Sequence, residues 1–307
     1  MIEARAATIG AVRPGGAEVA DYVALLKPRM MSLVLFTSAV GLAVAPGSIH
    51  PVLAIAALVC VAVGAGAAGA LNMWYDADID AGMARTAGRP IPAGRIAPGE
   101  ALGFGVALAG GAVMTMALLV NLASAAILAL TIGFYLFVYT MWLKRRSVHN
   151  TVVGGAAGAF PPMIGWAAVT GGLDWGALTL FAIVFLWQPT HFWALALYRA
   201  QDYARVGIPM LPVVAGEAET KRQMLLYAVA LYPVTLMPLP MGLGHAVYAA
   251  VAVPFGLAFV GLTVAVWRSR DLAQAGYAPA KRLFAYSILY LFLLFAALLA
   301  ERLMGLA

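Results

Sequence analysis

The most charge-dense segment of the chain is residues 71–92, LNMWYDADIDAGMARTAGRPIP, which directly follows a long apolar run. Asn72, Asp76 and Asp80 recur every four residues, so on a helix of about 3.6 residues per turn they share one face. Asp78 points roughly the opposite way. The pattern predicts a membrane helix that ends in a row of oxygen ligands.

Two arginines complete this segment. Arg85 and Arg89 follow Gly82, which weakens a helix, so the chain can fold both guanidinium groups back over the carboxylates. Hard cations prefer carboxylate and phosphate oxygens, and the arginine fork fits phosphate. The segment therefore indicates a site for a diphosphate bridged by Mg²⁺. The alternative is an ordinary solvated loop between membrane helices.

The composition excludes a soluble domain, because 64% of the 307 residues are hydrophobic and only 10% are charged. The single cysteine, Cys60, excludes an intrachain disulfide and a CxxC metal or redox site. Residues 1–28 lack the apolar core of a secretory signal peptide. We predict a mobile cytoplasmic tail over residues 1–20 and a single transmembrane domain over residues 21–307.

Nine apolar segments predict an all-α polytopic membrane protein with nine transmembrane helices. They are residues 30–45, 51–71, 101–121, 122–143, 151–170, 175–198, 224–241, 245–267 and 283–303. Only a tight turn near Asn121 separates the third segment from the fourth. The first segment is short for a hydrocarbon core of about 30 Å.

The basic residues predict the orientation. If the N-terminus is cytoplasmic, every one of the 19 lysines and arginines except Arg302 lies on the cytoplasmic side. The outer loops are short and nearly uncharged. We therefore expect a multi-pass protein of the cell inner membrane with its active site on the cytoplasmic side.

A second polar segment leaves the sixth helix as residues 190–214, THFWALALYRAQDYARVGIPMLPVV. The second and sixth predicted helices are parallel, so each delivers an aspartate to the same membrane face. Asp202 can complete the metal site from the opposite side. Alternatively it is a surface aspartate paired with Arg199 or Arg205.

Between these segments lie residues 143–166, LKRRSVHNTVVGGAAGAFPPMIGW. The basic residues 144–146 either anchor a helix at the cytoplasmic side or reach a diphosphate. The glycines and alanines allow close helix contact. Pro161 and Pro162 are expected to break the helix within the membrane.

His191 lies inside the sixth helix, among Trp187, Phe192 and Trp193. An intramembrane histidine is a candidate functional residue. The alternative is a histidine that packs or hydrogen bonds between helices.

Three blocks of sequence resemble the UbiA superfamily of intramembrane prenyltransferases, and within it the branch that farnesylates haem. They are NMWYDADID with RTAGRPIP, LKRRSVHNTVVGGAAGAFPPMIGWAA, and YRAQDYARVGIPMLPVV. The resemblance runs from about Asp21 to the last helix. It implies nine helices around a cavity open to lipid, Mg²⁺ as cofactor, and transfer of the farnesyl group of farnesyl diphosphate to a vinyl group of haem b. Water adds to the product and diphosphate is released.

One departure concerns the second motif of the superfamily, which usually has two aspartates four residues apart. Here Asp202 is followed by Val206. A symmetric metal site built from two complete motifs is therefore not implied.

Residues and resemblance together predict the site. The predicted catalytic residues are Asp76, Asp80, Asp202, Arg85 and Arg89. The predicted substrate contacts are Asn72, Lys144, Arg145, Tyr198, Arg199 and His191, and the predicted Mg²⁺ ligands are Asn72, Asp76, Asp80 and Asp202. His191 lies about 16 Å deeper than Asp202 at ~1.5 Å per residue, which is where a haem ring would lie.

The expected partners are farnesyl diphosphate, haem b and the lipid bilayer, with a haem A synthase or terminal oxidase assembly to receive the product and no nucleic acid. Two alternatives stay open. A related prenyltransferase acting on 4-hydroxybenzoate, a quinone precursor or a chlorophyllide would share the aspartates. A secondary transporter would need charged residues deep within the apolar runs, and the runs have none there.

Overall fold

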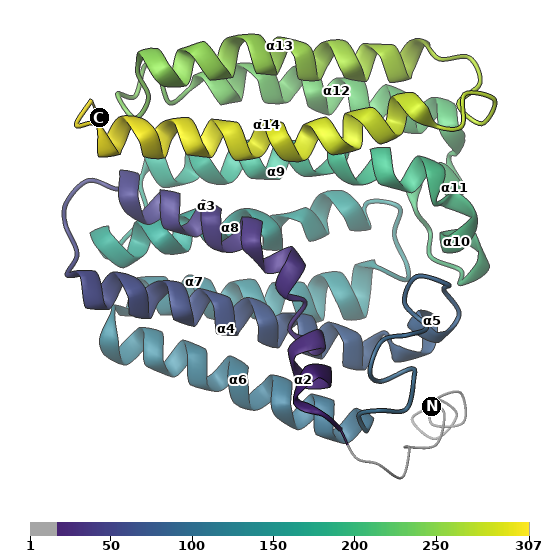
Figure 1. Cartoon of the computed structure of the whole chain (residues 1–307), viewed down its shortest axis with the longest axis horizontal. Helices are drawn as coiled ribbons and strands as arrows, with labels where there is room; N and C mark the ends of the chain where they lie inside the picture. Colours follow the sequence, from purple (N-terminus) through teal and green to yellow (C-terminus); the bar gives the residue numbers. More distant parts are fainter. Residues whose placement is uncertain (1–16, 307) are drawn as a thin grey trace.

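The computed structural model describes residues 17–306 of the chain, in which every regular element is helical. The all-α prediction is confirmed. The helices are α2 Val19–Leu25, α3 Pro28–Val44, α4 Pro51–Tyr75, α5 Ala77–Ala81, α6 Pro98–Leu119, α7 Leu122–Gly133, η1 Phe134–Leu143, α8 Asn150–Thr170, α9 Trp175–Tyr198, α10 Ala200–Arg205, α11 Leu211–Val214, α12 Gly216–Leu236, α13 Ala246–Arg268 and α14 Ala278–Leu303 (Figure 1). Most of the predicted tail lies outside the described residues.

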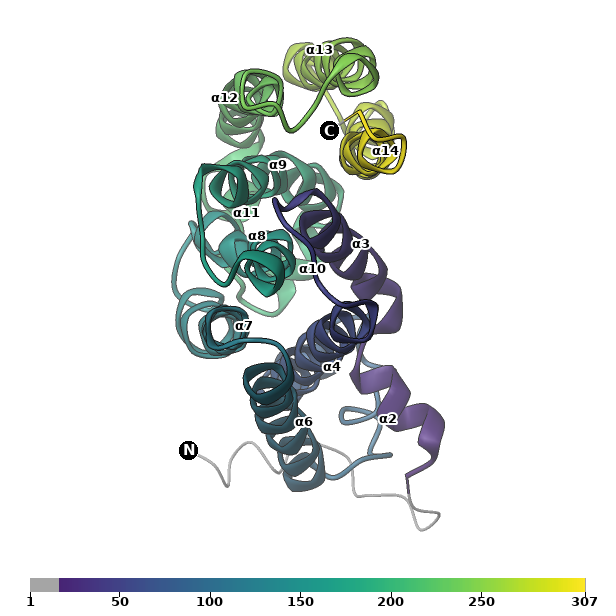
Figure 2. The ribbon, with the colours of Figure 1, turned by 90° about the vertical axis from the view of Figure 1, so that its left-hand side faces the viewer.

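The long helices pack in chain order into a closed circuit. α3 packs on α4, α4 on α6, α6 on α7, α7 on α8, α8 on α9, α9 on α12, α12 on α13, and α13 on α14. α14 then returns to pack on α3, so the two ends of the domain meet (Figure 2). α8 also packs against α3, and α9 against α14. These two cross-contacts fill the middle of the bundle.

Each of the nine predicted segments is largely helical, although residues 237–241 lie beyond α12 and residues 122–143 are divided between α7 and η1. Seven helices are long and apolar enough to cross a membrane, namely α4, α6, α7 with η1, α8, α9, α13 and α14. α3 is apolar but shorter, and α12 begins with a charged turn that includes Glu217 and Glu219. The chain is thus a multi-pass membrane protein, and the count of nine spans stays a prediction.

The expectation that Pro161 and Pro162 break their helix is wrong, because α8 runs without interruption through both. A proline removes one backbone donor but keeps a helical φ, and here α3 supports the helix from the side. A Cβ on Gly41 would lie 2.1 Å from the Pro162 carbonyl oxygen, and one on Gly165 would lie 2.0 Å from the Ser38 carbonyl oxygen. The two backbones therefore touch, which only glycine permits at these positions.

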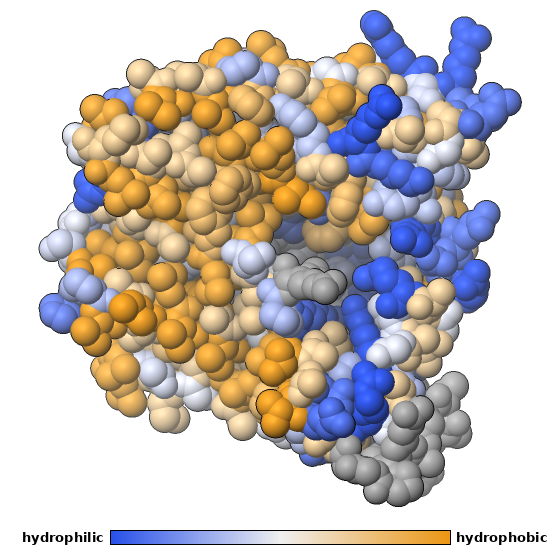
Figure 3. Space-filling view, in the orientation of Figure 1, coloured by the Kyte–Doolittle hydropathy of each residue, from blue (hydrophilic) through white to orange (hydrophobic). Residues whose placement is uncertain are grey.

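The two ends of the bundle differ in polarity. α5, α10 and α11 lie at one end, and the C-terminus and the loop between α3 and α4 lie at the other (Figure 1). Hydrophobic residues cover much of the face in Figure 3, while hydrophilic residues gather at the end that carries α5, α10 and α11. The same view shows a hollow with hydrophilic residues in it near that end. The chemistry of the predicted site is therefore concentrated at one end.

One acidic residue near the end of the last apolar run is fully buried. Glu301 of α14 accepts hydrogen bonds from the backbone N–H groups of His245, at 2.7 Å, and Tyr248, at 2.9 Å. These groups lie at the start of α13, where the helix dipole favours a negative charge. Glu301 therefore caps α13.

We expect Glu301→Ala to lower the free energy of unfolding by about 1–3 kcal/mol, because two buried donors lose their partner. Thermal unfolding of the purified protein in detergent measures this. Glu219→Ala is the matched control, since Glu219 pairs with Arg222 on an exposed surface and its loss should change the melting temperature little. Equal melting temperatures for the two variants would contradict the capping role.

Candidate active site

The acidic row lies where α4 ends and α5 begins. Asp76 is fully buried, and Asn72 and Asp80 are only 3% and 2% exposed. The Asp78 side chain, in contrast, is 25% exposed. The Asn72 Nδ2 group donates a hydrogen bond of 2.7 Å to Asp76 Oδ2. Three side chains thus face inward and one outward, which is the arrangement that the four-residue spacing predicts.

Basic side chains after η1 balance these carboxylates. Lys144 Nζ forms an ion pair with Asp76 Oδ2. Arg145 binds Asp78 through both terminal nitrogens, at 2.8 and 2.6 Å, and its Nη2 lies 3.5 Å from Asp76 Oδ1. A buried carboxylate needs such partners because burial in a low dielectric is costly for an unpaired charge. The basic residues 144 and 145 therefore reach the site rather than serving only as an anchor.

The predicted return of the arginines is confirmed for Arg89, whose Nη1 lies 2.5 Å from Asp80 Oδ2. Thr86 stabilises the turn between Asp80 and Arg89, because its hydroxyl donates to the Asp80 carbonyl oxygen at 2.9 Å. Arg85 is exposed and takes part in none of the ion pairs found among the described residues. Arg85 is thus left at the surface of the site.

Lys27 is a member of this group that the sequence pattern did not identify. It lies between α2 and α3 with a left-handed backbone, φ 54°, and its Nζ donates to Asn72 Oδ1 at 2.7 Å. Burial, with the charges of Arg89 and Lys144 nearby, lowers the pKa of Lys27 to about 7. An anion at this position would favour the charged form again. The sequence around Lys27 did not predict this role, because its partner Asn72 lies 45 residues further along the chain.

The wall opposite Asn72 is a π-helix, η1. The buried Thr140 hydroxyl donates to the Tyr135 carbonyl oxygen at 2.8 Å and accepts from Asn72 Nδ2 at 3.1 Å. Tyr135 and Tyr139 stack with ring centroids 5.3 Å apart. Short π-helical stretches are frequent at functional sites. Most residues of this segment are hydrophobic or aromatic, and nothing in their order distinguishes a π-helix from an α-helix.

Asp202 does not lie with the other predicted ligands. α9 ends at Tyr198, and Asp202 belongs to the separate helix α10, where it pairs with Arg199 at 3.6 Å and Arg205 at 4.0 Å. These pairs match the alternative prediction, in which Asp202 is a surface aspartate paired with its neighbouring arginines. Over residues 17–306, no three His, Cys, Asp or Glu side chains lie close enough together to form a ready-made metal-binding cluster. The four predicted ligands are therefore not assembled into one cluster.

The two aspartate-bearing segments nevertheless lie side by side. Met83, Ile208 and Met210 share one small apolar cluster. A Cβ on Gly82 would lie 2.9 Å from a methyl carbon of Val206, so these two residues are in close contact. The position where the superfamily usually has a second aspartate thus packs against the turn that follows α5.

The inner face has the chemistry that a hard cation needs. Asp76 Oδ1 is buried and has no hydrogen-bond partner in the described part of the chain, with only the Arg145 guanidinium at 3.5 Å. An unpartnered buried carboxylate oxygen is unfavourable. Together with the oxygens of Asn72 and Asp80 it offers the ligand type that Mg²⁺ prefers. These residues fit a divalent cation that would replace Lys144 as the charge partner of Asp76.

The remaining predicted residues form a second group at the junction of α9, α10 and α14. A hollow of about 270 Å³ is lined by Tyr198, Arg199, Asp202 and Tyr277, among others. The Tyr198 ring lies 5.8 Å from Arg199 Cζ and 5.8 Å from Lys281 Nζ. The structure therefore gathers Tyr198, Arg199 and Asp202 around one hollow, and His191 lies farther back along α9.

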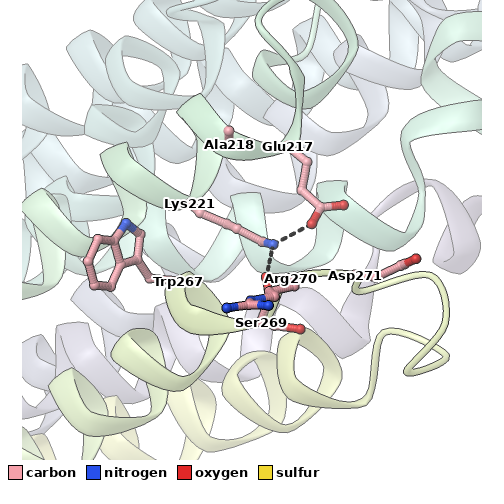
Figure 4. Close-up of a pocket in the computed structure, with 7 residues that line it drawn as sticks. All are labelled: Glu217, Ala218, Lys221, Trp267, Ser269, Arg270 and Asp271. Atoms are coloured by element: carbon pink, nitrogen blue, oxygen red, sulfur yellow. Dashed lines mark hydrogen bonds and ion pairs between the residues drawn. The ribbon is translucent and has the colours of Figure 1, made fainter.

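A larger hollow, of about 430 Å³, lies where α12 meets the end of α13. Lys221 Nζ donates to the Ser269 carbonyl oxygen at 2.7 Å and forms an ion pair with Glu217 (Figure 4). None of the predicted site residues lines it. Lys221 joins α12 to the connection after α13, so we assign this hollow a structural role.

Comparison with known proteins places the chain in a family. The model of the UbiA prenyltransferase family matches residues 34–288. The chain belongs to this family. Among curated relatives of this UbiA chain, a protoheme IX farnesyltransferase of Parvibaculum lavamentivorans is 61% identical over 286 residues, which are 93% of this chain and 90% of that protein. One of Rhodopseudomonas palustris is 54% identical over 301 residues, 98% of this chain and 96% of that protein.

Solved structures share the UbiA fold. A digeranylgeranylglyceryl phosphate synthase superposes with a TM-score of 0.76 at 14% identity, covering 93% of this chain and 99% of that one. A UbiA homologue from Archaeoglobus fulgidus bound to GPP and Mg²⁺ gives a TM-score of 0.68 at 17% identity, covering 91% and 99%. The UbiA chain is therefore a multi-pass membrane enzyme of the prenyltransferase class.

We expect Asp76→Asn and Asp80→Asn each to lower the turnover rate about 100-fold or more, because each removes charge from the buried face that would bind the cation and the diphosphate. Asp78→Asn should cost about fivefold at most, since a partly exposed ion pair contributes up to ~1 kcal/mol. The initial rate of prenyl transfer, measured for each purified variant, tests both expected reductions. An essential Asp78 beside a dispensable Asp76 would contradict the assignment of the inner face.

Proposed function

We propose that this UbiA prenyltransferase transfers the farnesyl group of farnesyl diphosphate to a vinyl group of haem b, giving haem O and diphosphate. The observation that carries the proposal is the near full-length identity, 54–61%, to relatives named protoheme IX farnesyltransferase. The buried carboxylates and the surrounding basic side chains provide the chemistry for the diphosphate half of that reaction.

The metal ligands in this proposal are Asn72, Asp76, Asp80 and Asp202. The unpartnered Asp76 Oδ1 atom supports a cation at the inner face, and Asp202 would join once Arg199 and Arg205 release it. The homologue solved with GPP and Mg²⁺ supports a divalent metal for the family. When bound, Mg²⁺ would supply charge neutralisation for the departing diphosphate.

The basic residues would bind the diphosphate itself. Lys27, Arg89, Lys144 and Arg145 now contact Asn72 or the aspartates, and a diphosphate would draw them from those oxygens to its own. Arginine suits this role because its fork binds phosphate through two parallel hydrogen bonds. Arg85, exposed at the edge, would close over the bound anion.

The proposed bond changes balance with one water molecule as the third reactant. The bond from farnesyl C1 to the diphosphate oxygen breaks, and its electron pair leaves with diphosphate. A new carbon–carbon bond joins farnesyl C1 to the terminal vinyl carbon, which leaves a cation at the inner vinyl carbon. A water oxygen bonds there and releases one proton to solvent. The protein has to stabilise the leaving anion and exclude other water until capture.

The proposed setting is the cell inner membrane, with the basic end of the bundle in the cytoplasm. Haem b and the farnesyl chain are apolar enough to enter from the bilayer, and the diphosphate would stay at the polar end. A haem A synthase or a terminal oxidase assembly would receive the product.

The proposed reaction can be tested by incubating the purified protein with farnesyl diphosphate, haem b and Mg²⁺ and then recording the mass of the extracted haem. We expect a haem heavier by one farnesyl group and one hydroxyl group, and no product after chelation of the metal or with Asp76→Asn. If 4-hydroxybenzoate or a quinone precursor is prenylated while haem b is unchanged, the acceptor is wrong.

The proposed orientation predicts how introduced cysteines react in intact cells. Gly88 and Gly172 both leave room for a side chain and need no left-handed backbone, and the native Cys60 is buried. Because an impermeant thiol reagent reaches only the outer face, we expect it to label Gly172→Cys and not Gly88→Cys. The reverse pattern would place the acidic row outside the cell.

A further inference from the structure

The seam between α9 and α14 holds one histidine in a fixed position. The His191 ring is stacked between Trp187, with centroids 4.4 Å apart and planes at 18°, and Phe284, at 4.6 Å and 22°. The residue is 8% exposed. Because both ring faces are covered, only the edge of the imidazole is available to a ligand.

Ser287 of α14 contacts one ring nitrogen of His191. The Ser287 hydroxyl lies 2.6 Å from His191 Nδ1 and donates to the Phe284 carbonyl oxygen at 2.6 Å. A hydroxyl has a single proton. Donation of that proton to the carbonyl leaves the Ser287 oxygen to accept from Nδ1–H, and on this basis we assign the proton of the neutral His191 ring to Nδ1. The Ser287 carbonyl also accepts from Trp187 Nε1 at 2.7 Å, so one residue fixes both α9 rings.

A neutral imidazole with its proton on Nδ1 has a lone pair on Nε2. In the described part of the chain, Nε2 of His191 has no hydrogen-bond partner. A histidine whose Nδ1–H is held by a second residue, with Nε2 open, is the arrangement typical of a metal ligand. Among the described residues, the His191 ring contacts a serine and aromatic side chains but no carboxylate. The expected ligand is therefore a metal in an apolar, aromatic setting.

We propose that Ser287 is a positioning residue that presents His191 Nε2 to the iron of the haem substrate, so that the enzyme selects an iron porphyrin over a metal-free one. This inference rests on the proposed function. His191 lies seven residues before the end of α9, or about 10 Å at ~1.5 Å per residue, on the membrane side of the polar end. The ring would thus lie in the apolar interior while the diphosphate stays among the charged residues.

A simpler explanation is that the His191–Ser287 hydrogen bond only joins two helices. That role would affect stability but would not discriminate between porphyrins with and without iron. The experiment therefore titrates haem b and metal-free protoporphyrin IX separately into the full-length protein, following the Soret band for haem and fluorescence quenching for protoporphyrin. The melting temperature and the affinity for farnesyl diphosphate are measured on the same samples.

The variants are His191→Ala, Ser287→Ala and Ser287→Thr. Ser38→Ala is the matched control, because Ser38 of α3 is also a fully buried serine and its hydroxyl has no partner in the described residues. We expect His191→Ala to lose the spectrum of imidazole-ligated iron. Ser287→Ala should weaken haem b binding about 10- to 100-fold, as removal of a residue behind a metal ligand does. Ser287→Thr keeps the hydroxyl and should retain binding.

In every variant we expect unchanged affinity for protoporphyrin IX and for farnesyl diphosphate. An equal loss of haem b and protoporphyrin binding in Ser287→Ala would overturn the inference in favour of packing, as would a wild-type Soret band in His191→Ala. For a readout that does not depend on Ser287→Ala folding, His191→Gly is titrated with free imidazole, which should restore the ligated spectrum. Wild-type protein that binds haem b through a histidine but transfers no farnesyl group would instead refute the proposed function alone.

Discussion

The polar end of the bundle depends on one constraint, the need to balance the charge of the fully buried Asp76. Its carboxylate has Asn72 on one side, Lys144 on another and the Arg145 guanidinium at 3.5 Å. These partners come from the end of α4 and from the connection after η1, so the buried charge determines where the two segments meet. A buried pair of this kind is weak evidence for stability, since breaking it is costly but replacing it with apolar residues often is not. The proposed cation site therefore explains the buried carboxylate better than stability does.

The pairing of buried charges also explains why the site could accept both a divalent cation and a diphosphate. Three of its basic side chains already lie against aspartates, and burial brings the pKa of the fourth, Lys27, to about 7. A cation would bring positive charge to the carboxylates while a diphosphate takes over the basic side chains. Because both enter a site that is already paired, the exchange needs little net change in buried charge. A site with free carboxylates would instead be strained when empty.

The sequence predicted the contacts that are close along the chain. Asn72, Asp76 and Asp80 share a face because their spacing matches the helical repeat, and Arg89 returns to Asp80 across nine residues. Contacts that depend on packing were not predictable, such as Lys27 with Asn72, 45 residues apart. The spacing left open whether Asp202 joins the metal site or pairs with its neighbours, and in this structure it pairs with Arg199 and Arg205.

The same limit applies to backbone shape. The π-helix at the wall of the site runs through a mostly hydrophobic and aromatic segment, and the helix through Pro161 and Pro162 touches α3 at Gly41. Such features follow from helix packing, because η1 contacts α4, α7 and α8, and α3 contacts both α8 and α14. α3 begins beside Lys27, and α14 carries Ser287. The aromatic seam joins α9 to α14 and so depends on the last helix, whereas the contacts of the charged group lie within residues 27–145.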